Sequence, residues 1–153
     1  MNKLKVLSLD IASLTGWCLE PNLYGTWNLK TLKDESIGMK LIRFRAKLSE
    51  IHELEKLDVI LYERAAGQHK SSIIHEAKMI GIVEEWCETN GVDYTCYSAT
   101  EIKKFATGKG NAGKPAMIKA AKEKYGYDGD DDNEADAIHM RELFRAQIEN
   151  KKV

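Results

Sequence analysis

Residues 4–11, LKVLSLDI, are rich in leucine, valine and isoleucine and carry one carboxylate, Asp10, near their end. This composition predicts a buried β-strand. Residues 58–63, DVILYE, form a second run of this kind and end on Glu63. A continuous apolar run is typical of a strand covered on both faces, as in a mostly parallel sheet. A carboxylate at the end of a buried strand is costly unless it is hydrogen-bonded, paired or bound to metal.

These two acids lie together if their strands are parallel neighbours, because the strands then end at the same edge of the sheet. Adjacent strands lie roughly 5 Å apart, so Asp10 and Glu63 can share one ion. The alternative is that each acid only caps a loop. The occurrence of two such acids, followed by an acidic helix start, favours the shared site.

The rest of the chain alternates strand and helix patterns. The predicted strands are residues 4–11, 15–20, 24–29, 58–63 and 92–97. The predicted helices are residues 36–56, 72–90, 99–106, 115–125 and 132–150. This order predicts an α/β fold with a mixed five-stranded sheet flanked by helices. The length predicts a single domain over residues 1–153.

Residues 130–140, DDDNEADAIHM, crowd acidic side chains at the start of the last predicted helix. Asp131 and Glu134 have the spacing of a capping box, and acidic residues complement the positive end of a helix dipole. Asp136 differs, because its helical spacing places it on the apolar stripe expected to face the sheet. Asn133 is three residues earlier and on the same side of the helix. Asn133 and Asp136 are therefore candidates to join the two strand-end acids.

Oxygen ligands of this kind select Mg²⁺ or Mn²⁺ rather than zinc. A pair of such ions suits phosphoryl chemistry, since it can activate a water and stabilise the leaving oxygen. No histidine–cysteine cluster offers a zinc alternative. The cysteines, Cys18, Cys87 and Cys96, are widely spaced and odd in number, as is typical of reduced core thiols. With no signal peptide or bilayer-spanning stretch in the sequence, we expect a cytoplasmic protein of a bacterium or of a phage-infected host cell.

Lysines are concentrated in residues 101–124, although the whole chain has a net charge of only −1. This segment has seven lysines against two acidic residues, and its glycines let backbone N–H groups approach phosphate closely. The pattern favours a polyanion held beside the metal site; the alternative is a solvated loop followed by an ordinary lysine-rich helix face. A second basic stretch follows Glu63. The predicted DNA contacts are Arg64, His69, Lys70, Lys104, Lys109 and Lys114.

Five segments resemble, in the same order, the motifs of the RuvC family of Holliday-junction resolvases, within the RNase H-like superfamily. LSLDIASLTGW (residues 7–17) resembles the first motif and VILYE (59–63) the second. HKSSIIHEAKMIG (69–81) resembles the long helix that contributes to the family's dimer interface, and IKKFATGKGNAGK (102–114) resembles its basic loop. NEADAIHM (133–140) resembles the closing motif. Each motif alone is weak, but five in the right order are specific.

The resemblance implies a RuvC-like nuclease domain that cuts four-way DNA junctions by paired nicks as a homodimer, in DNA recombination and repair. It implies Mg²⁺ as the cofactor, with Mn²⁺ able to substitute, and 5′-phosphate and 3′-hydroxyl ends. The implied metal ligands are Asp10, Glu63, Asn133 and Asp136. The implied catalytic residues are Asp10, Glu63 and Asp136, together with Lys103 and Lys114 near the scissile phosphate.

Two features depart from the family pattern. Asn133 stands where the family usually has Asp or His, and an amide ligand brings no charge. Residues 64–69, RAAGQH, lack the aromatic wedge that the family often has after the second carboxylate. We therefore expect looser selectivity that extends to forks and flaps. Two alternatives stay open: an RNase H-type nuclease acting on RNA–DNA hybrids, and a catalytically weakened protein that binds branched DNA.

Overall fold

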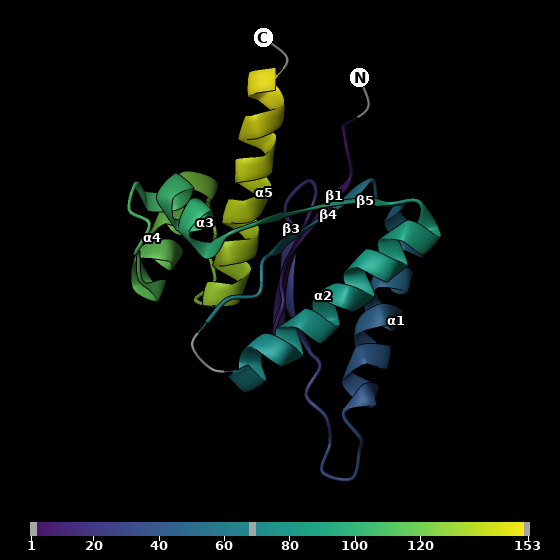
Figure 1. Cartoon of the computed structure of the whole chain (residues 1–153). Helices are drawn as coiled ribbons and strands as arrows, with labels where there is room; N and C mark the ends of the chain where they lie inside the picture. Colours follow the sequence, from purple (N-terminus) through teal and green to yellow (C-terminus); the bar gives the residue numbers. More distant parts are fainter. Residues whose placement is uncertain (1–2, 68–69, 152–153) are drawn as a thin grey trace.

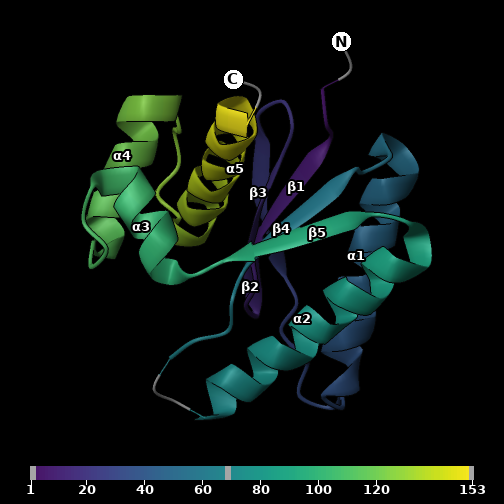
Figure 2. The same cartoon turned by 45° about the horizontal axis from the view of Figure 1, so that its top comes forward.

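Five strands form one sheet in the order β3-β2-β1-β4-β5, and helices cover both of its faces (Figures 1 and 2). The structure, a computed structural model, describes residues 3–67 and 70–151. The strands are β1 (Val6–Asp10), β2 (Leu14–Leu19), β3 (Leu23–Asn28), β4 (Val59–Glu63) and β5 (Asp93–Tyr97). The helices are α1 (Gly38–Glu55), α2 (Lys70–Asn90), α3 (Ala99–Thr107), α4 (Lys114–Tyr125) and α5 (Asp132–Lys151). The predicted α/β fold is confirmed, and the element ends agree with the predicted ones to within two residues.

The sheet is mixed. β1, β2 and β3 form an antiparallel meander, whereas β4 pairs with the other side of β1 in parallel and β5 pairs in parallel with β4. A parallel neighbour needs a crossover connection, and α1 and α2 provide these connections before and after β4. The parallel pairing of the two acid-bearing strands is the arrangement on which the predicted site depends.

The sheet separates two apolar layers. On one face, Ile60 of β4 packs with Phe44 of α1 and Val83 of α2. On the other face, Leu61 of β4 packs with Met140 of α5. Figure 2 shows α1 and α2 on one side of the sheet and α3, α4 and α5 on the other. The central strand β4 is therefore covered twice, which accounts for its continuous apolar run.

Local signals set the ends of the shorter helices. Ser98 and Glu101 form a capping box at the start of α3, with hydrogen bonds of 3.1 and 3.2 Å. Pro115 lies in the first turn of α4, as its missing N–H allows. α3 and α4 end at Gly108 and Gly126, whose φ angles of 86° and 69° lie in the left-handed region that glycine enters without strain.

The start of α5 differs in part from its prediction. Asp131 caps the helix, because its Oδ1 accepts hydrogen bonds from the backbone N–H groups of Asn133 at 2.7 Å and Glu134 at 3.2 Å. The reciprocal half of the predicted capping box is absent. The Glu134 carboxylate instead accepts hydrogen bonds from Thr26 and from the Tyr127 hydroxyl, and that same hydroxyl accepts the N–H of Asp131. The predicted box is therefore only half formed: Asp131 caps the helix as predicted, but Tyr127 takes the partners of the second bond.

The three cysteines are free thiols. Cys18 and Cys87 are buried, and burial raises the pKa of each to about 12. Both are therefore inert thiols at neutral pH. Cys96 on β5 is half-buried and packs against the edge of the core, so it is a core thiol only in part. Within residues 3–67 and 70–151, no helix has the length and apolar character needed to cross a bilayer.

Candidate active site

Asp10 and Glu63 leave the sheet side by side. The register of β1 and β4 pairs Leu9 with Tyr62, and the next residue in each strand is the carboxylate. Both acids are half-buried. Because the two strands are parallel, the acids come to the same edge of the sheet, which is the placement that the sequence predicted.

Asp136 comes to this edge from α5, which packs on β1, β2 and β4. Its Oδ1 is buried and has no hydrogen-bond partner among the described residues. Burial, followed by the negative charges of Glu63 and Asp132, raises the pKa of Asp136 to about 7. Charges act on a pKa in this way only at short range. Asp136 therefore belongs to the same electrostatic cluster as the strand-end acids.

The remaining pKa shifts in this cluster have the same direction. Burial raises the pKa of Asp10 well above its usual value, and the charges of Asp136, Glu63 and Asp132 raise it further. Burial and the charge of Glu76 raise the pKa of Glu63. Burial and neighbouring negative charges thus disfavour ionisation of these carboxylates, although the hydrogen bond with Asp10 lowers the pKa of Asp136. Such an arrangement favours the binding of a cation, and perturbed carboxylates of this kind are typical of functional sites.

The donor atoms of this cluster fit a hard divalent cation. In the part of the chain that the structure describes, no three His, Cys, Asp or Glu side chains form a ready-made metal group. The chemistry of the donors nevertheless suits Mg²⁺, which prefers carboxylate oxygens and keeps several waters. A cation would also satisfy the buried Oδ1 of Asp136, which lacks a partner among the described residues. It would neutralise the repulsion among the carboxylates.

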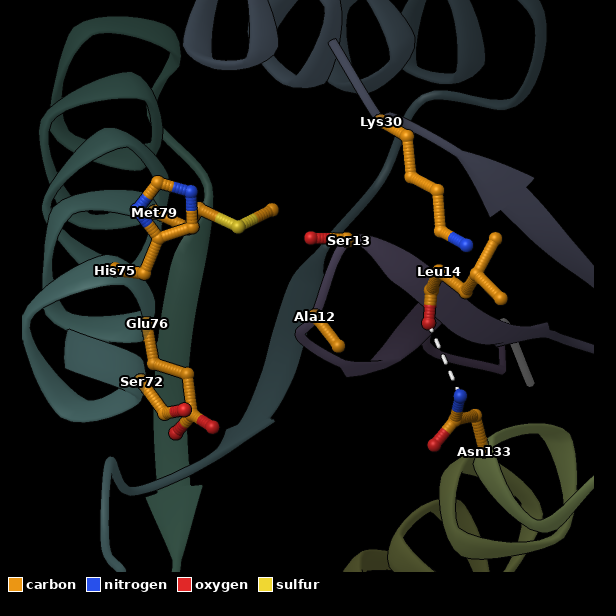
Figure 3. A pocket seen from close by; sticks show the side chains of 9 residues that line it. All are labelled: Ala12, Ser13, Leu14, Lys30, Ser72, His75, Glu76, Met79 and Asn133. Atoms are coloured by element: carbon orange, nitrogen blue, oxygen red, sulfur yellow. Dashed lines mark hydrogen bonds between the residues drawn. The ribbon is translucent and has the colours of Figure 1, made fainter. Parts of the chain in front are cut away.

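Asn133 faces the β1–β2 turn from the first turn of α5. Its Nδ2 donates a hydrogen bond to the carbonyl oxygen of Leu14 at 3.1 Å. Figure 3 shows the amide oxygen pointing away from this bond. The structure therefore assigns the amide nitrogen to holding the turn and leaves the amide oxygen as the atom available to a ligand.

Asp132 is a member of the cluster that the sequence analysis missed. After burial, its charge is among the causes that raise the pKa of Asp10 and of Asp136. From the sequence alone, the charge of residues 130–132 was explained by the helix dipole. A signal was present, however, because Asp132 and Asp136 are four residues apart and thus on one face of α5.

Lys103 and Lys114 approach the cluster from α3 and α4. Burial raises the pKa of both Glu63 and Asp136, and the charge of Lys103 opposes this shift in each case. Lys114 is exposed, and its Nζ lies 3.6 Å from Oδ2 of Asp132. Two basic side chains from separate helices therefore border the carboxylates.

The other predicted DNA contacts lie on the surface. Arg64 directly follows β4 and is exposed, with its guanidinium 3.9 Å from the carboxylate of Glu101. The exposed lysines of this set lie on α2, on α3 and in the loop before α4: Lys70, Lys104 and Lys109. The predicted contact His69 lies outside the described residues.

A cavity of about 370 Å³ lies between α2 and the β1–β2 turn (Figure 3). Its walls include Ser13 from the turn, Leu14 from the start of β2, Glu76 from α2 and Asn133 from α5. Glu76 links the cavity to the carboxylates. Burial raises the pKa of Glu63 most, and the negative charge of Glu76 raises it further. No local sequence pattern brings these distant segments together, so the cavity was not predicted.

No protein-family model and no curated protein sequence matches this chain. Solved structures do. RuvC of Thermus thermophilus in complex with a Holliday junction substrate matches with a TM-score of 0.72 at 16% identity, over 90% of both chains. A structure titled simply as Thermus thermophilus RuvC matches with a TM-score of 0.69 at 16% identity, again over 90% of both chains. The yeast mitochondrial Holliday junction resolvase Ydc2 matches with a TM-score of 0.61 at 13% identity, over 90% of this chain and 75% of that chain.

The sheet order and the flanking helices define an RNase H-like fold. Within that class, the chain has the fold of the RuvC resolvases, as the sequence motifs implied.

Proposed function

We propose that this protein is a metal-dependent endonuclease that resolves four-way DNA junctions by paired nicks. The observation that carries the proposal is the meeting of Asp10, Glu63 and Asp136 at one edge of a RuvC-like sheet. Carboxylates with raised pKa values at such an edge suit metal-assisted phosphodiester hydrolysis. A structural neighbour that was solved with a Holliday junction substrate supports branched DNA as the substrate class.

The three carboxylates would hold Mg²⁺, with the amide oxygen of Asn133 as a weaker ligand and Mn²⁺ as a substitute. When bound, the metal supplies a Lewis acid that activates water and stabilises the leaving oxygen. The chain's own part is to fix the ligands. The paired ends of β1 and β4 set the spacing of Asp10 and Glu63, while α5 orients Asp136 against them.

Two lysines serve the scissile phosphate. Lys103 and Lys114 border the carboxylates and are assigned to positioning the phosphate and balancing its charge. Water is the nucleophile, and the ends are a 5′-phosphate and a 3′-hydroxyl, as the family resemblance implies. Contacts to the DNA backbone further from the cut are assigned to Arg64, His69, Lys70, Lys104 and Lys109.

Paired nicks need two active sites, which we assign to a homodimer formed through α2. This helix resembles the one that contributes to the family's dimer interface. It also exposes a large apolar side chain, Ile74, with 55% of its surface accessible. An exposed apolar residue on a long helix suits a partner helix of a second copy.

A second candidate function is a branched-DNA-binding protein with weakened catalysis. Asn133 favours it, because the amide brings no charge to the metal and its nitrogen is already bonded to Leu14. The presence of all three carboxylates favours the nuclease. An RNase H-type activity on RNA–DNA hybrids has no observation in its favour beyond the shared fold class.

The deciding experiment is a cleavage assay on synthetic four-way junctions with Mg²⁺ and with Mn²⁺, comparing the wild type with Asp10→Asn. The proposal expects symmetric paired nicks that the variant loses while it still binds junctions. Forked, flapped, linear and RNA–DNA hybrid substrates form the comparison set. Tight junction binding without cleavage in either metal would favour the binding protein, and preferential cleavage of the hybrid would favour the RNase H-type nuclease.

A further inference from the structure

Lys40 of α1 is a buried ammonium group without a carboxylate partner among the described residues. Only 5% of its surface is exposed, and its Nζ lies 2.6 Å from Oγ of Ser13 in the β1–β2 turn. Burial lowers the pKa of Lys40, and no carboxylate is among the causes. A buried charge normally has a counter-ion, because an unpaired one is costly. The buried ammonium group of Lys40 therefore lies against Ser13 at a cost in the stability of the fold.

The hydroxyl group of Ser13 links the Lys40 ammonium group to the cavity beside the active site. Its oxygen accepts the hydrogen bond from Lys40, so its own hydrogen points elsewhere, and the described residues offer it no acceptor. Ser13 lines the cavity, and Figure 3 shows its oxygen directed into the space in front of α2. A hydroxyl polarised by an ammonium group is a strong donor to an anion.

The surroundings of Ser13 are those of an anion site with a defined orientation. Lys30 reaches the cavity from the end of β3, and His75 lines it from α2. Burial, helped by Lys40 and Lys78, lowers the pKa of His75, so its neutral ring can still donate a hydrogen bond. The one acid of the lining, Glu76, lies toward Glu63. The cavity is thus basic at one end and meets the catalytic carboxylates at the other.

We propose that the hydroxyl group of Ser13, polarised by Lys40 and assisted by Lys30, binds the DNA backbone phosphate next to the one that is cut. This assignment rests on the proposed nuclease function and defines where the cleaved DNA strand passes through the active site. Ser13 is three residues beyond Asp10, so their Cα atoms are at most about 10 Å apart. This separation suits phosphates that are close neighbours along one strand.

Neutral linkages test the proposal directly. Four-way junctions are made with a single uncharged methylphosphonate at each position around the cut, and affinity and single-turnover cleavage are measured. For the wild type, a neutral linkage at one position beside the cut is expected to reduce affinity and cleavage rate about tenfold. Ser13→Ala is expected to lose the same factor in affinity and cleavage rate on the natural junction. The neutral linkage at that position is then expected to cause no further loss in this variant. If Ser13→Ala stays as sensitive as the wild type at every position, the subsite is wrong.

Lys40→Met separates a functional role from a structural one. The variant keeps the volume of the side chain and removes the buried charge, so its thermal stability is expected to equal or exceed that of the wild type. Its linkage profile is expected to match that of Ser13→Ala. A matched control is Ser36→Ala, an exposed serine in the segment before α1 and outside the cavity lining, which is expected to keep the wild-type profile. A folded Lys40→Met protein with the wild-type profile would contradict the proposal.

A titration with inorganic phosphate distinguishes failure of the subsite from failure of the nuclease. Backbone amide resonances of residues 12–14 and the ring resonances of His75 are followed by NMR in the wild type and Ser13→Ala. If the wild type cleaves junctions and Ser13→Ala is unaffected, the nuclease stands and the subsite falls. If no branched DNA is bound or cut, the nuclease falls. Phosphate-dependent shifts that Ser13→Ala abolishes would then support the anion site, and their absence would overturn it.

Discussion

Gly16 of β2 lies directly against the backbone of Asn133 in the first turn of α5. A Cβ built on Gly16 would stand 2.3 Å from the carbonyl carbon of Asn133, closer than non-bonded atoms approach. The hydrogen bond from Asn133 to Leu14 closes the same contact. This approach sets how near α5 comes to the sheet, and therefore how near Asp136 comes to the strand-end acids.

Gly16→Ala is expected to displace the start of α5 and to reduce both stability and cleavage. The added methyl group meets backbone, which cannot move aside as a flexible side chain can. Overpacking of this kind costs about 1–3 kcal/mol or more of unfolding free energy. Thermal unfolding and the junction-cleavage rate are the measurements.

Gly38→Ala is the matched control. Gly38 begins α1, is exposed, and a Cβ there would meet nothing within 4 Å. The substitution is expected to change stability by no more than about 0.5 kcal/mol and to leave cleavage unchanged. Equal effects of the two substitutions would mean that the approach of β2 to α5 does not position the site.

The sequence was sufficient for the fold because its signals are local. The apolar run of residues 58–63, for example, predicts its own strand. The pairing of Asp10 with Glu63 also follows, since parallel strands end at a common edge. The half-formed capping box was beyond prediction, because Thr26 of β3, which lies 108 residues earlier in the chain, donates to the Glu134 carboxylate.

Contacts between distant segments account for what the sequence analysis missed. The bond from Lys40 to Ser13 joins α1 to the β1–β2 turn, and the effect of Glu76 on Glu63 joins α2 to β4. Neither pair has a spacing that a pattern can reveal. Asp132 is different. Its separation from Asp136 is a helical spacing that the sequence does reveal, but its charge was already explained by the helix dipole.

Asp136→Asn is expected to abolish cleavage while stabilising the metal-free protein. The substitution removes a buried charge that faces Glu63 and Asp132 and whose Oδ1 lacks a partner among the described residues. Relief of this repulsion is expected to raise the unfolding temperature in EDTA by roughly 2–4 °C per kcal/mol gained. Mg²⁺ is expected to stabilise the wild type, because it binds the folded state, and to stabilise the variant much less.

Asp130→Asn is the control for that experiment. Asp130 belongs to the same acidic helix start, but its side chain is 89% exposed and pairs with Lys122 at 2.8 Å. Its removal is expected to change stability by no more than about 0.5 kcal/mol and to leave the Mg²⁺ effect intact. A Mg²⁺ effect that survives in Asp136→Asn would exclude Asp136 as a ligand.

Lys103→Met and Lys104→Met are expected to separate catalysis from binding. Lys103 faces the carboxylates, whereas Lys104 is exposed on α3. Loss of Lys103 is expected to reduce the single-turnover rate by about 10²-fold with little effect on affinity. Loss of Lys104 is expected to weaken binding and to reduce the slope of log affinity against log salt by about one. Similar losses of rate and affinity in both variants would contradict these roles.

His139 is expected to make the protein sensitive to acid. Its ring is fully buried, Nε2 donates to the carbonyl oxygen of Met117 at 2.8 Å, and Nδ1 has no partner among the described residues. Burial lowers its pKa, and the nearby charge of Lys124 lowers it further, against the opposite effects of Met117 and of Glu142. The unfolded chain therefore takes up the proton first. The stability that the neutral ring provides is complete above the unfolded pKa of about 6.5 and is lost as pH falls toward the folded pKa.

His139→Gln isolates this effect, because glutamine places a donor where Nε2 stands and does not titrate. Urea unfolding is measured for both proteins between pH 8 and pH 5, values chosen to bracket the usual histidine pKa of about 6.5. The wild type is expected to lose stability relative to the variant below about pH 6.5, by no more than about 1.4 kcal/mol per pH unit. The comparison cancels the carboxylates, whose raised pKa values act in the opposite direction. Parallel curves for the two proteins would rule out the effect.

Asn133→Asp tests whether the amide oxygen is a metal ligand. A carboxylate cannot donate to the carbonyl oxygen of Leu14, so the metal-free variant is expected to lose about 1–2 kcal/mol of unfolding free energy. The added charge is expected to bind Mg²⁺ more tightly and to lower the half-saturating Mg²⁺ concentration for cleavage roughly tenfold. Asn133→Ala loses both the bond and the ligand and is expected to need more Mg²⁺. If the aspartate variant also needs more Mg²⁺ than the wild type, Asn133 only holds the β1–β2 turn and the metal site consists of the carboxylates alone.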